Sequence, residues 1–267
     1  MSYKKIKLFC VTDKPLPSLE DSCLNLVGVG KELFNNKYLD CSKKENIYYK
    51  EKNYSELTFH YWYWKNLLQN EDAEWVGFCQ KRRFWIKSSS INKNITSENL
   101  VDHLLVEPEN DWRKFDSMLC SPINVTGAKK IKILKRGWRN IIFNPGLIFK
   151  KNSETIKIHF DMHHGHKNLE KAIKVLNNKD KNEFNDFVNI QKTYNPHIMF
   201  ITKSEIANEW FKDLFEWLFR CEEIFGFENL KGYDTMRIYA YLAERYLSFW
   251  FQKHTKFKNS PWVFINH

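Results

Sequence analysis

Three adjacent cations follow a short apolar run in the first half of the chain. Residues 75–79 have the composition of a buried strand, and Gln80 comes directly after them. The next three residues are Lys81, Arg82 and Arg83. In an α/β sheet, ligands bind beyond the carboxyl ends of the strands, and arginine can grip two phosphate oxygens at once. The run could therefore hold an anionic group such as a diphosphate, although short basic runs are common and a solvated turn is the competing interpretation.

A second cluster of reactive side chains contains four histidines, at positions 159, 163, 164 and 166. Neutral imidazoles bind zinc or manganese. No cysteine lies within a few residues of them, however, and Asp161 is the only carboxylate nearby. We therefore predict no metal site there. Gly165 and the context of Phe160 and Asp161 favour a turn between a strand and a helix over a continuous helix.

The composition is that of a folded, basic protein. Its 267 residues fit one large domain or two small ones, and an aromatic content of 16% argues against disorder. The formal charge of +10 suits nucleic acid, an anionic membrane surface or anionic small substrates. The six cysteines are scattered and form no C-x-x-C pair. Cys10, Cys79 and Cys120 each lie in an apolar strand-like run and are expected to be reduced core residues, with zinc binding or a disulfide as minor alternatives. The first apolar run is too short for a signal sequence or a membrane span, so we expect a cytoplasmic protein.

Apolar runs alternate with helical patterns, which predicts βαβ units and a mostly parallel sheet flanked by helices. Residues 124–157 differ, and they are interpreted as a loop-rich or hairpin insertion. We expect a single domain over 1–267, with a nucleotide-sugar-binding sheet half at 1–160 and a more helical acceptor-side half at 161–267. The predicted strands lie at 5–11, 24–29, 74–79, 115–120 and 199–202, and the predicted helices at 55–68, from 96, at 167–176, 181–191, 204–225 and 235–253.

Several segments resemble the family catalogued as domain of unknown function 4422. Residues 53–66 are similar to its "YSELT-x-x-YW-x-WKN" helix, and residues 77–83 to its "GFCHYRR" strand end. In the family's order, residues 7–15 resemble its first strand and turn, 162–169 its histidine-containing helix entry, 195–201 its "N-M-F-I" strand and 241–247 its "LAERLL" helix. The chain departs from the pattern at Gln80 and Lys81, where His-Tyr is usual, and at Ile198, where Asn is expected.

That family is associated with bacterial capsule and exopolysaccharide synthesis and is regarded as glycosyltransferases. The resemblance implies a GT-A-like α/β fold and sugar transfer from a nucleotide-sugar donor to a capsular or cell-surface polysaccharide. A UDP-sugar is the expected donor, with UDP-galactofuranose among the candidates. A lipid-linked glycan acceptor would bring the enzyme to the inner membrane as a peripheral protein, with the lysine-rich residues 129–139 facing anionic lipid. The competing class is a non-catalytic basic glycan- or nucleic-acid-binding protein, although no nucleic-acid-binding motif is present and no nucleic-acid partner is expected.

GT-A enzymes usually hold a divalent cation with an Asp-x-Asp motif, which this chain lacks. Our hypothesis is that Lys81, Arg82 and Arg83 stabilise the leaving diphosphate instead, so that no cofactor is required. A divalent cation is the alternative that the sequence does not exclude. Glu244 is the best-matched general base, with a structural ion pair to Arg245 as an equal alternative. Asp161 and Glu56 are the weaker candidates for the catalytic carboxylate.

The remaining site residues follow from position and from the resemblance. Thr12 and Asp13 come after the first strand, where a base and ribose would be recognised. Arg245 could hold either Glu244 or a donor phosphate. Substrate contacts are expected at Glu56, Trp64, His166 and His197. Glu56 could equally stabilise the start of its helix, and the aromatic helix around Trp64 could equally be core.

Overall fold

A computed structural model describes residues 5–126 and 154–266. The chain divides into two compact units. The first, called here the sheet unit, contains residues up to 121, 197–213 and those from 251 onward. The second, the helical unit, contains residues 122–196 and 214–250. The chain enters each unit more than once, so the division does not fall at a single point near residue 160. That the whole chain forms one domain stays a prediction.

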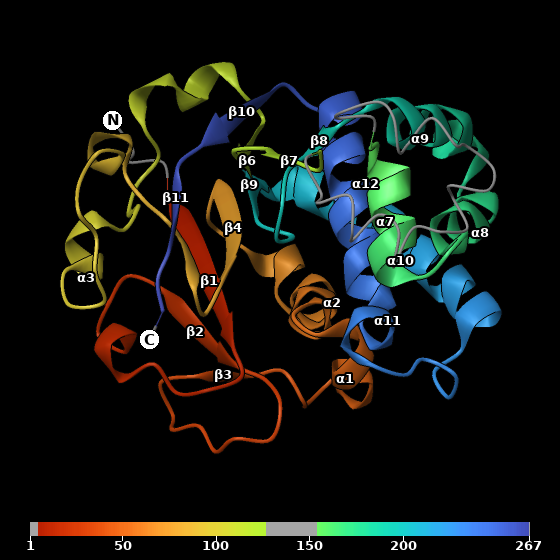
Figure 1. Ribbon diagram of the computed structural model, residues 1–267. Coiled ribbons are helices and arrows are strands. Elements are labelled where there is room, and N and C mark those ends of the chain that lie inside the picture. The colour runs from red at the N-terminus through yellow and green to blue at the C-terminus, as the bar shows by residue number, and fades with distance from the viewer. Residues whose placement is uncertain (1–4, 127–153, 267) are drawn as a thin grey trace. The chain divides into compact units, whose positions relative to one another are not determined.

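The sheet unit is built on a nine-stranded sheet, counted over the described residues (Figure 1). Its main path runs β10–β6–β9–β4–β1–β2–β3, and β5 and β11 attach beyond β4. Six of these strands come from the first 120 residues, and three come from the segment after residue 199. The strands are β1 (Ile6–Thr12), β2 (Asn25–Gly28), β3 (Leu39–Asp40), β4 (Trp75–Gln80), β5 (Arg83–Trp85), β6 (Ser117–Cys120), β9 (Phe200–Lys203), β10 (Phe257–Ser260) and β11 (Trp262–Phe264).

The centre of this sheet is parallel. Strand β1 pairs in parallel with both β2 and β4, and Cys10 lies opposite Cys79 in the β1–β4 register. The exception on the main path is β9, which runs antiparallel between β4 and β6. The prediction of an α/β fold with a mostly parallel central sheet is confirmed, and β4 lies in its interior as expected.

Aromatic packing holds helices against one face of the sheet. The Phe78 ring on β4 lies 5.4 Å from Tyr63 of α2 (Leu57–Asn66) and 5.7 Å from Phe211 of α10 (Ser204–Phe225), measured between ring centroids. The aromatic residues of α2 are thus largely core. The other helical segments of this unit are α1 (Glu51–Tyr54), α3 (Leu100–His103) and the 3₁₀ turns η1 (Pro17–Leu19), η2 (Tyr48–Lys50), η3 (Leu68–Asn70), η4 (Ser88–Ser90) and η5 (Asn110–Lys114).

The helical unit has its own aromatic core. The Tyr246 ring lies 4.9 Å from Trp217 and 5.3 Å from Phe184, and its hydroxyl donates to Asp180 at 2.7 Å. Helices α10 and α12 each continue from one unit into the other. The elements are the short pair β7 (Ile123–Asn124) and β8 (Thr193–Tyr194), with α7 (Ile156–His164), α8 (Asn168–Lys174), α9 (Asn178–Ile190), α11 (Tyr233–Met236) and α12 (Ile238–His254).

The prediction of a turn around the clustered histidines is wrong, because these residues lie on helix α7. The Thr155 side chain accepts a hydrogen bond from the Ile158 amide and caps the start of the helix. Gly165, with φ of 100°, ends it. The expected turn therefore begins only at Gly165. The interpretation of 124–157 as an insertion, including its lysine-rich stretch, falls mostly on residues 127–153, which lie outside the described residues.

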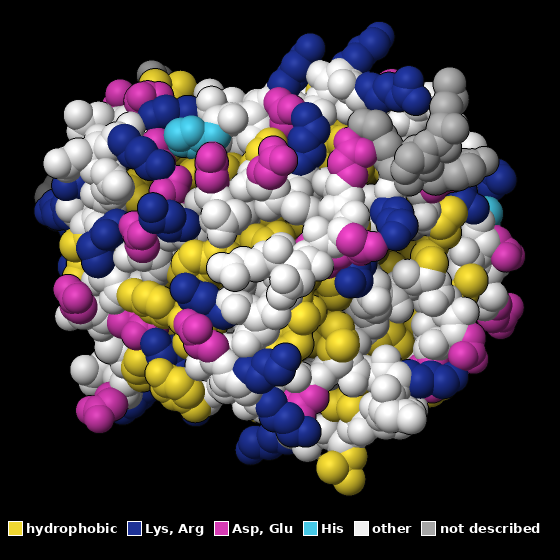
Figure 2. Space-filling view, turned by 180° about the vertical axis from the view of Figure 1, so that it is seen from behind, with side chains coloured by type: hydrophobic (Ala, Val, Ile, Leu, Met, Phe, Trp, Pro, Cys, Tyr) yellow, Lys and Arg dark blue, Asp and Glu magenta, His cyan; other side chains and the backbone are white. Residues whose placement is uncertain are grey.

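Charge is dispersed on the face drawn in Figure 2. Lys and Arg side chains there alternate with Asp and Glu and with exposed hydrophobic groups. The net positive charge is therefore not gathered into one patch on that face. Over residues 5–126 and 154–266, no helix combines the length and the apolar composition needed to cross a membrane.

Candidate functional site

The carboxyl ends of β1 and β4 lie side by side in the sheet unit. The Lys81 amide donates to the Val11 carbonyl at 3.1 Å, which extends the pairing of the two strands past the end of β4. Beyond it, the Lys81 ammonium forms an ion pair with the Asp13 carboxylate. Both side chains remain partly exposed, at 29% and 43%. Two residues predicted to contact the donor are therefore brought together at the sheet edge where α/β folds bind ligands.

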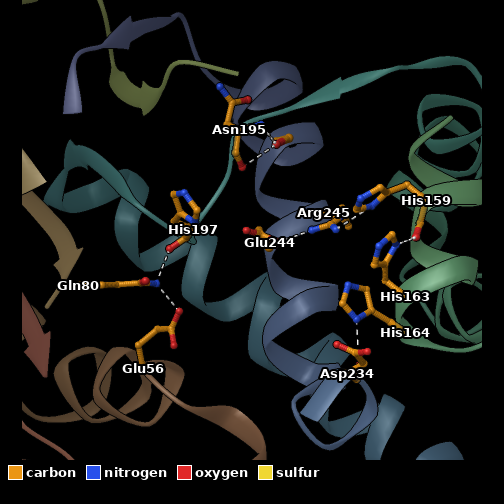
Figure 3. Close-up of polar contacts among 11 residues, drawn as sticks. Glu56, Gln80, His159, His163, His164, Asn195, His197, Asp234, Glu244 and Arg245 are labelled. Carbon is orange, nitrogen blue, oxygen red and sulfur yellow. Dashed lines mark hydrogen bonds and ion pairs between the residues drawn. The ribbon is translucent and has the colours of Figure 1, made fainter. Parts of the chain in front are cut away.

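Gln80, the last residue of β4, connects three segments through one amide group, and Figure 3 shows its contacts with two of them, at Glu56 and His197. Its Nε2 donates to the Glu56 carboxylate, just before α2, and to the His197 carbonyl at 2.6 Å. Its Oε1 accepts from Arg83 Nη1 at 3.2 Å. The start of α2, the turn before β9 and the start of β5 thus meet at the end of the central strand.

Arg82 and Arg83 are held differently from each other. The β4–β5 hairpin pairs Gln80 with Arg83, which leaves Lys81 and Arg82 as its two connecting residues. Arg82 is exposed and Arg83 is half-buried. Their guanidinium carbons lie 5.7 and 5.5 Å from the Phe264 ring on β11, within the range of cation–π attraction. The solvated-turn interpretation thus describes Arg82 better than Arg83, whose guanidinium is fixed by Gln80 and Phe264.

The segment before β9 has an unusual backbone. His197 and Ile198 have φ of 77° and 51°, in the left-handed region that favours glycine and asparagine. A left-handed backbone costs about 1–2 kcal/mol per residue with an L side chain, and Ile198 is β-branched and buried. The His197 ring packs edge-on against Trp262 of β11 at 4.9 Å. The family's asparagine at position 198 would adopt this backbone more easily than the isoleucine present.

Two other predicted contacts have local partners of their own. The Thr12 hydroxyl is buried and accepts from the Lys14 amide at 3.1 Å, so it shapes the turn after β1. Trp64 donates from Nε1 to Asn208 at 2.8 Å and lies beneath the Lys65 ammonium at 3.8 Å. Eight residues separate it from Glu56, which is about 12 Å along a helix. We therefore place Trp64 outside the cluster around Gln80.

In the helical unit, Arg245 is the centre of a second group (Figure 3). Its side chain is 1% exposed and pairs with Glu244, which is 14% exposed. Its guanidinium carbon lies 3.9 Å above the Tyr194 ring, and Nη2 lies 3.5 Å from His159 Nδ1. Arg245 is thus buried against its neighbours, and of its two expected roles, the hold on Glu244 is the one for which a contact is observed.

His159 and His164, which lie near Arg245, are neutral at pH 7. Burial, reinforced by the Arg245 charge, lowers the pKa of His159 to about 3 and that of His164 to about 3. His164 Nδ1 lies 2.9 Å from the Asp234 carbonyl, and its ring stacks on Tyr241 at 3.8 Å. At neutral pH the charge in this group therefore comes from Arg245 and Glu244.

Asp161 holds the turn between α7 and α8. Its side chain is fully buried. It accepts from the Lys167 amide at 3.1 Å, and it lies 3.3 Å from Lys157 Nζ and 3.6 Å from His166 Nδ1. These contacts describe a structural anchor and link the predicted substrate contact His166 to it. Within the described ranges, no three His, Cys, Asp or Glu side chains are grouped so as to hold a metal ion.

Most of the predicted site residues thus have contacts at the end of β4, around Arg245 or around Asp161, whereas Thr12 and Trp64 have local partners of their own. Sequence reasoning missed the amide of Gln80 as a connector, the Tyr194 ring beneath Arg245, and the contributions of Trp262 and Phe264. The signal for Gln80 was its place between a buried strand and the basic run. Strand β11 could have been anticipated from the unbroken apolar run of residues 262–265 that follows Pro261.

Comparison with known proteins agrees with this fold. No curated protein matches the chain. Among solved structures, the chain is similar to one described as the WbbM bifunctional glycosyltransferase in its apo form, with a TM-score of 0.70 and 17% sequence identity. The match covers 98% of this chain but 46% of that protein, so the chain spans less than half of its length. A family model described as a domain of unknown function (DUF4422) matches residues 7–256, and the chain belongs to that family.

Proposed function

We propose that this protein is a hexosyltransferase-type glycosyltransferase that moves a sugar from a nucleotide-sugar donor, a UDP-sugar, to a capsular or cell-surface glycan. Two contacts at the carboxyl ends of β1 and β4 carry the proposal: the ion pair of Lys81 with Asp13, and the hydrogen bond of Arg83 to Gln80, the last residue of β4. The similarity in fold to a bifunctional glycosyltransferase supports it. UDP-galactofuranose is among the candidate donors.

In this proposal, the sheet unit binds the donor. When the glycosidic bond to the nucleotide breaks, negative charge develops on the leaving diphosphate, and fixed cations stabilise that charge. Arg83, held by Gln80, and the exposed Arg82 are the side chains proposed to contact the phosphate oxygens. Asp13 is proposed to accept from a ribose hydroxyl. Its ion pair with Lys81 keeps the carboxylate in place.

Glu244 is the proposed general base for the acceptor hydroxyl. Its carboxylate is mostly buried but not closed off, and Arg245 fixes it from one side. The glycan acceptor, free or lipid-linked, would have to bring its hydroxyl to this group. Association with an anionic inner leaflet, in a cytoplasmic setting, is part of the same proposal and would be carried by basic residues.

The side chains at the donor end also bear on the cation that such transferases often use. Hard divalent cations bind open carboxylates. Here Asp13 is paired with Lys81 and Glu56 with Gln80, so neither is an uncommitted ligand. This donor set fits the proposal that arginine and lysine, rather than a resident metal, neutralise the diphosphate.

A thermal-shift and calorimetry screen against UDP, GDP, CMP and their sugars tests the proposal, because a ligand that binds the native state raises its stability. We expect UDP to bind and Arg83→Ala to weaken it about tenfold or more, since hydrogen bonds to charged groups contribute about 1.5–3 kcal/mol. Arg113→Ala, at an exposed position of η5, is the matched control and should bind like the unmodified protein. Stabilisation by oligonucleotides alone would instead favour a non-catalytic basic binding protein.

A further inference from the structure

We propose that Gln80 is a positioning residue that sets Arg83 and the His197 turn relative to each other for donor binding. The inference rests on the proposed function, because it assigns Gln80 to the site at the end of β4. Sequence reasoning gave Gln80 no role beyond its departure from the family pattern. The assignment comes from the contacts that this one amide makes in the sheet unit.

The Gln80 side chain uses both ends of its amide. Nε2 donates to the Glu56 carboxylate and to the His197 carbonyl at 2.6 Å, while Oε1 accepts from Arg83 at 3.2 Å. A glutamine can do this because its amide carries two N–H donors and a separate acceptor. Glutamate has no donor for the two oxygens, and methionine has neither group. The three contacts therefore depend on an amide at this position.

The contact with His197 is the one that fixes an otherwise unfavourable backbone. His197 and Ile198 are consecutive left-handed residues, and the carbonyl bound by Gln80 belongs to the first of them. Residues in such conformations persist where their surroundings over-determine them, and they concentrate at ligand sites. The Trp262 ring packs against the imidazole from another strand. Gln80 and Trp262 together hold the turn by its backbone and by its side chain.

The same amide fixes the arginine. Arg83 follows the hairpin connection, and its guanidinium lies between Gln80 and the Phe264 ring. Without an acceptor at position 80, the long side chain would lose one of the contacts that restrict its rotamers, and donor binding would have to supply that ordering. Loss of the amide should therefore weaken donor binding even though no Gln80 atom is required to contact the donor.

The test compares Gln80→Met with Gln69→Met. Methionine matches glutamine in length and flexibility but provides no amide. Gln69 is exposed on η3 in the same unit, so its variant controls for the loss of an amide elsewhere. Two readouts are needed: the UDP dissociation constant by calorimetry, and hydrogen exchange of the amides at 197–199 without nucleotide. A melting curve establishes that each variant is folded at the temperature used.

We expect Gln80→Met to exchange faster at 197–199 and to bind UDP at least tenfold more weakly, with neither change in Gln69→Met. Unchanged exchange would overturn the hold on the turn, and unchanged UDP affinity in a folded variant would overturn the positioning role. If the unmodified protein binds no nucleotide, the proposed function fails and takes the positioning role with it. The exchange readout still decides whether Gln80 holds the turn. If Gln80→Met does not fold, Glu56→Gln replaces it as the test, because this variant leaves the Gln80 amide in place. We expect Glu56→Gln to keep slow hydrogen exchange at 197–199. Fast exchange there would contradict the proposal.

Discussion

Glu244 and Arg245 are neighbours in sequence but differ in exposure, at 14% and 1% of their side chains. A buried guanidinium needs a counter-charge, and Glu244 is the carboxylate that pairs with it in the described structure. The Arg245 guanidinium also contacts the neutral His159 and the rings of Phe160 and Tyr194. The structural role of Glu244 is therefore real whether or not it acts as a base. Stability alone cannot distinguish the two roles.

Turnover per folded molecule separates them. We expect Glu244→Gln to lose about 10²–10⁴ in rate if Glu244 is the base, and to lose about 3–5 kcal/mol of stability because Arg245 is left uncompensated. The double variant Glu244→Gln with Arg245→Met removes both charges and should recover most of that stability while staying inactive. Steady-state kinetics and urea unfolding measure the two effects. Normal transfer by the folded double variant would assign Glu244 to structure.

At the scale of elements, the sequence predicted most of what apolar periodicity can reveal. Helix α10 has the predicted bounds, and β4 lies within one residue of the predicted strand. Periodicity does not show that β9 pairs between β4 and β6, or that β10 and β11 return to the same sheet. The sequence-based prediction also failed at α7. The histidines next to Gly165 suggested a turn, and nothing in their pattern showed that Thr155 caps a helix that begins before them. The basic run was found because strand ends bind ligands, while Gln80 was missed because its partners are distant in sequence.

Because His164 is buried on α7, the free energy of unfolding should fall as the pH is lowered. Burial depresses the pKa of His164 to about 3 in the folded state, against about 6.5 when unfolded. The unfolded state therefore binds the proton first, and the stability present above pH 6.5 is lost as the pH falls toward 3. Between pH 7.5 and 5 this histidine alone should lower the unfolding free energy by about 2 kcal/mol.

Urea unfolding at several pH values measures this effect. His164→Gln should flatten the pH dependence of the unfolding free energy, whereas His254→Gln, at an exposed position, should leave it unchanged. Because burial also lowers the pKa of His159, His164→Gln should still show part of the pH dependence. Equal slopes in all three proteins would show that His164 has the same pKa in the folded and unfolded states, which would contradict the prediction.

At the scale of the whole molecule, the charge of +10 does not by itself define a binding surface. Lys and Arg are mixed with Asp and Glu on the face of Figure 2. The functional proposal depends instead on a few cations fixed by partners, such as Arg83 on Gln80. Such cations attract a diphosphate through short-range contacts, and added salt weakens those contacts where they are exposed.

Metal removal should therefore leave UDP binding unchanged, whereas added salt should weaken it. We expect excess EDTA to leave the UDP dissociation constant unchanged, because the proposed function gives Lys81, Arg82 and Arg83 the part that a metal cation would otherwise have. Raising sodium chloride should weaken binding, since it screens partly exposed charges such as Arg82. Calorimetry with and without added Mg²⁺ or Mn²⁺ measures both effects.

Binding that disappears in EDTA and returns with Mn²⁺ would contradict the metal-free proposal. The ligands would then have to be sought first at Asp161 and its neighbouring histidines, where a buried carboxylate would have to leave the Lys167 amide to reach a cation.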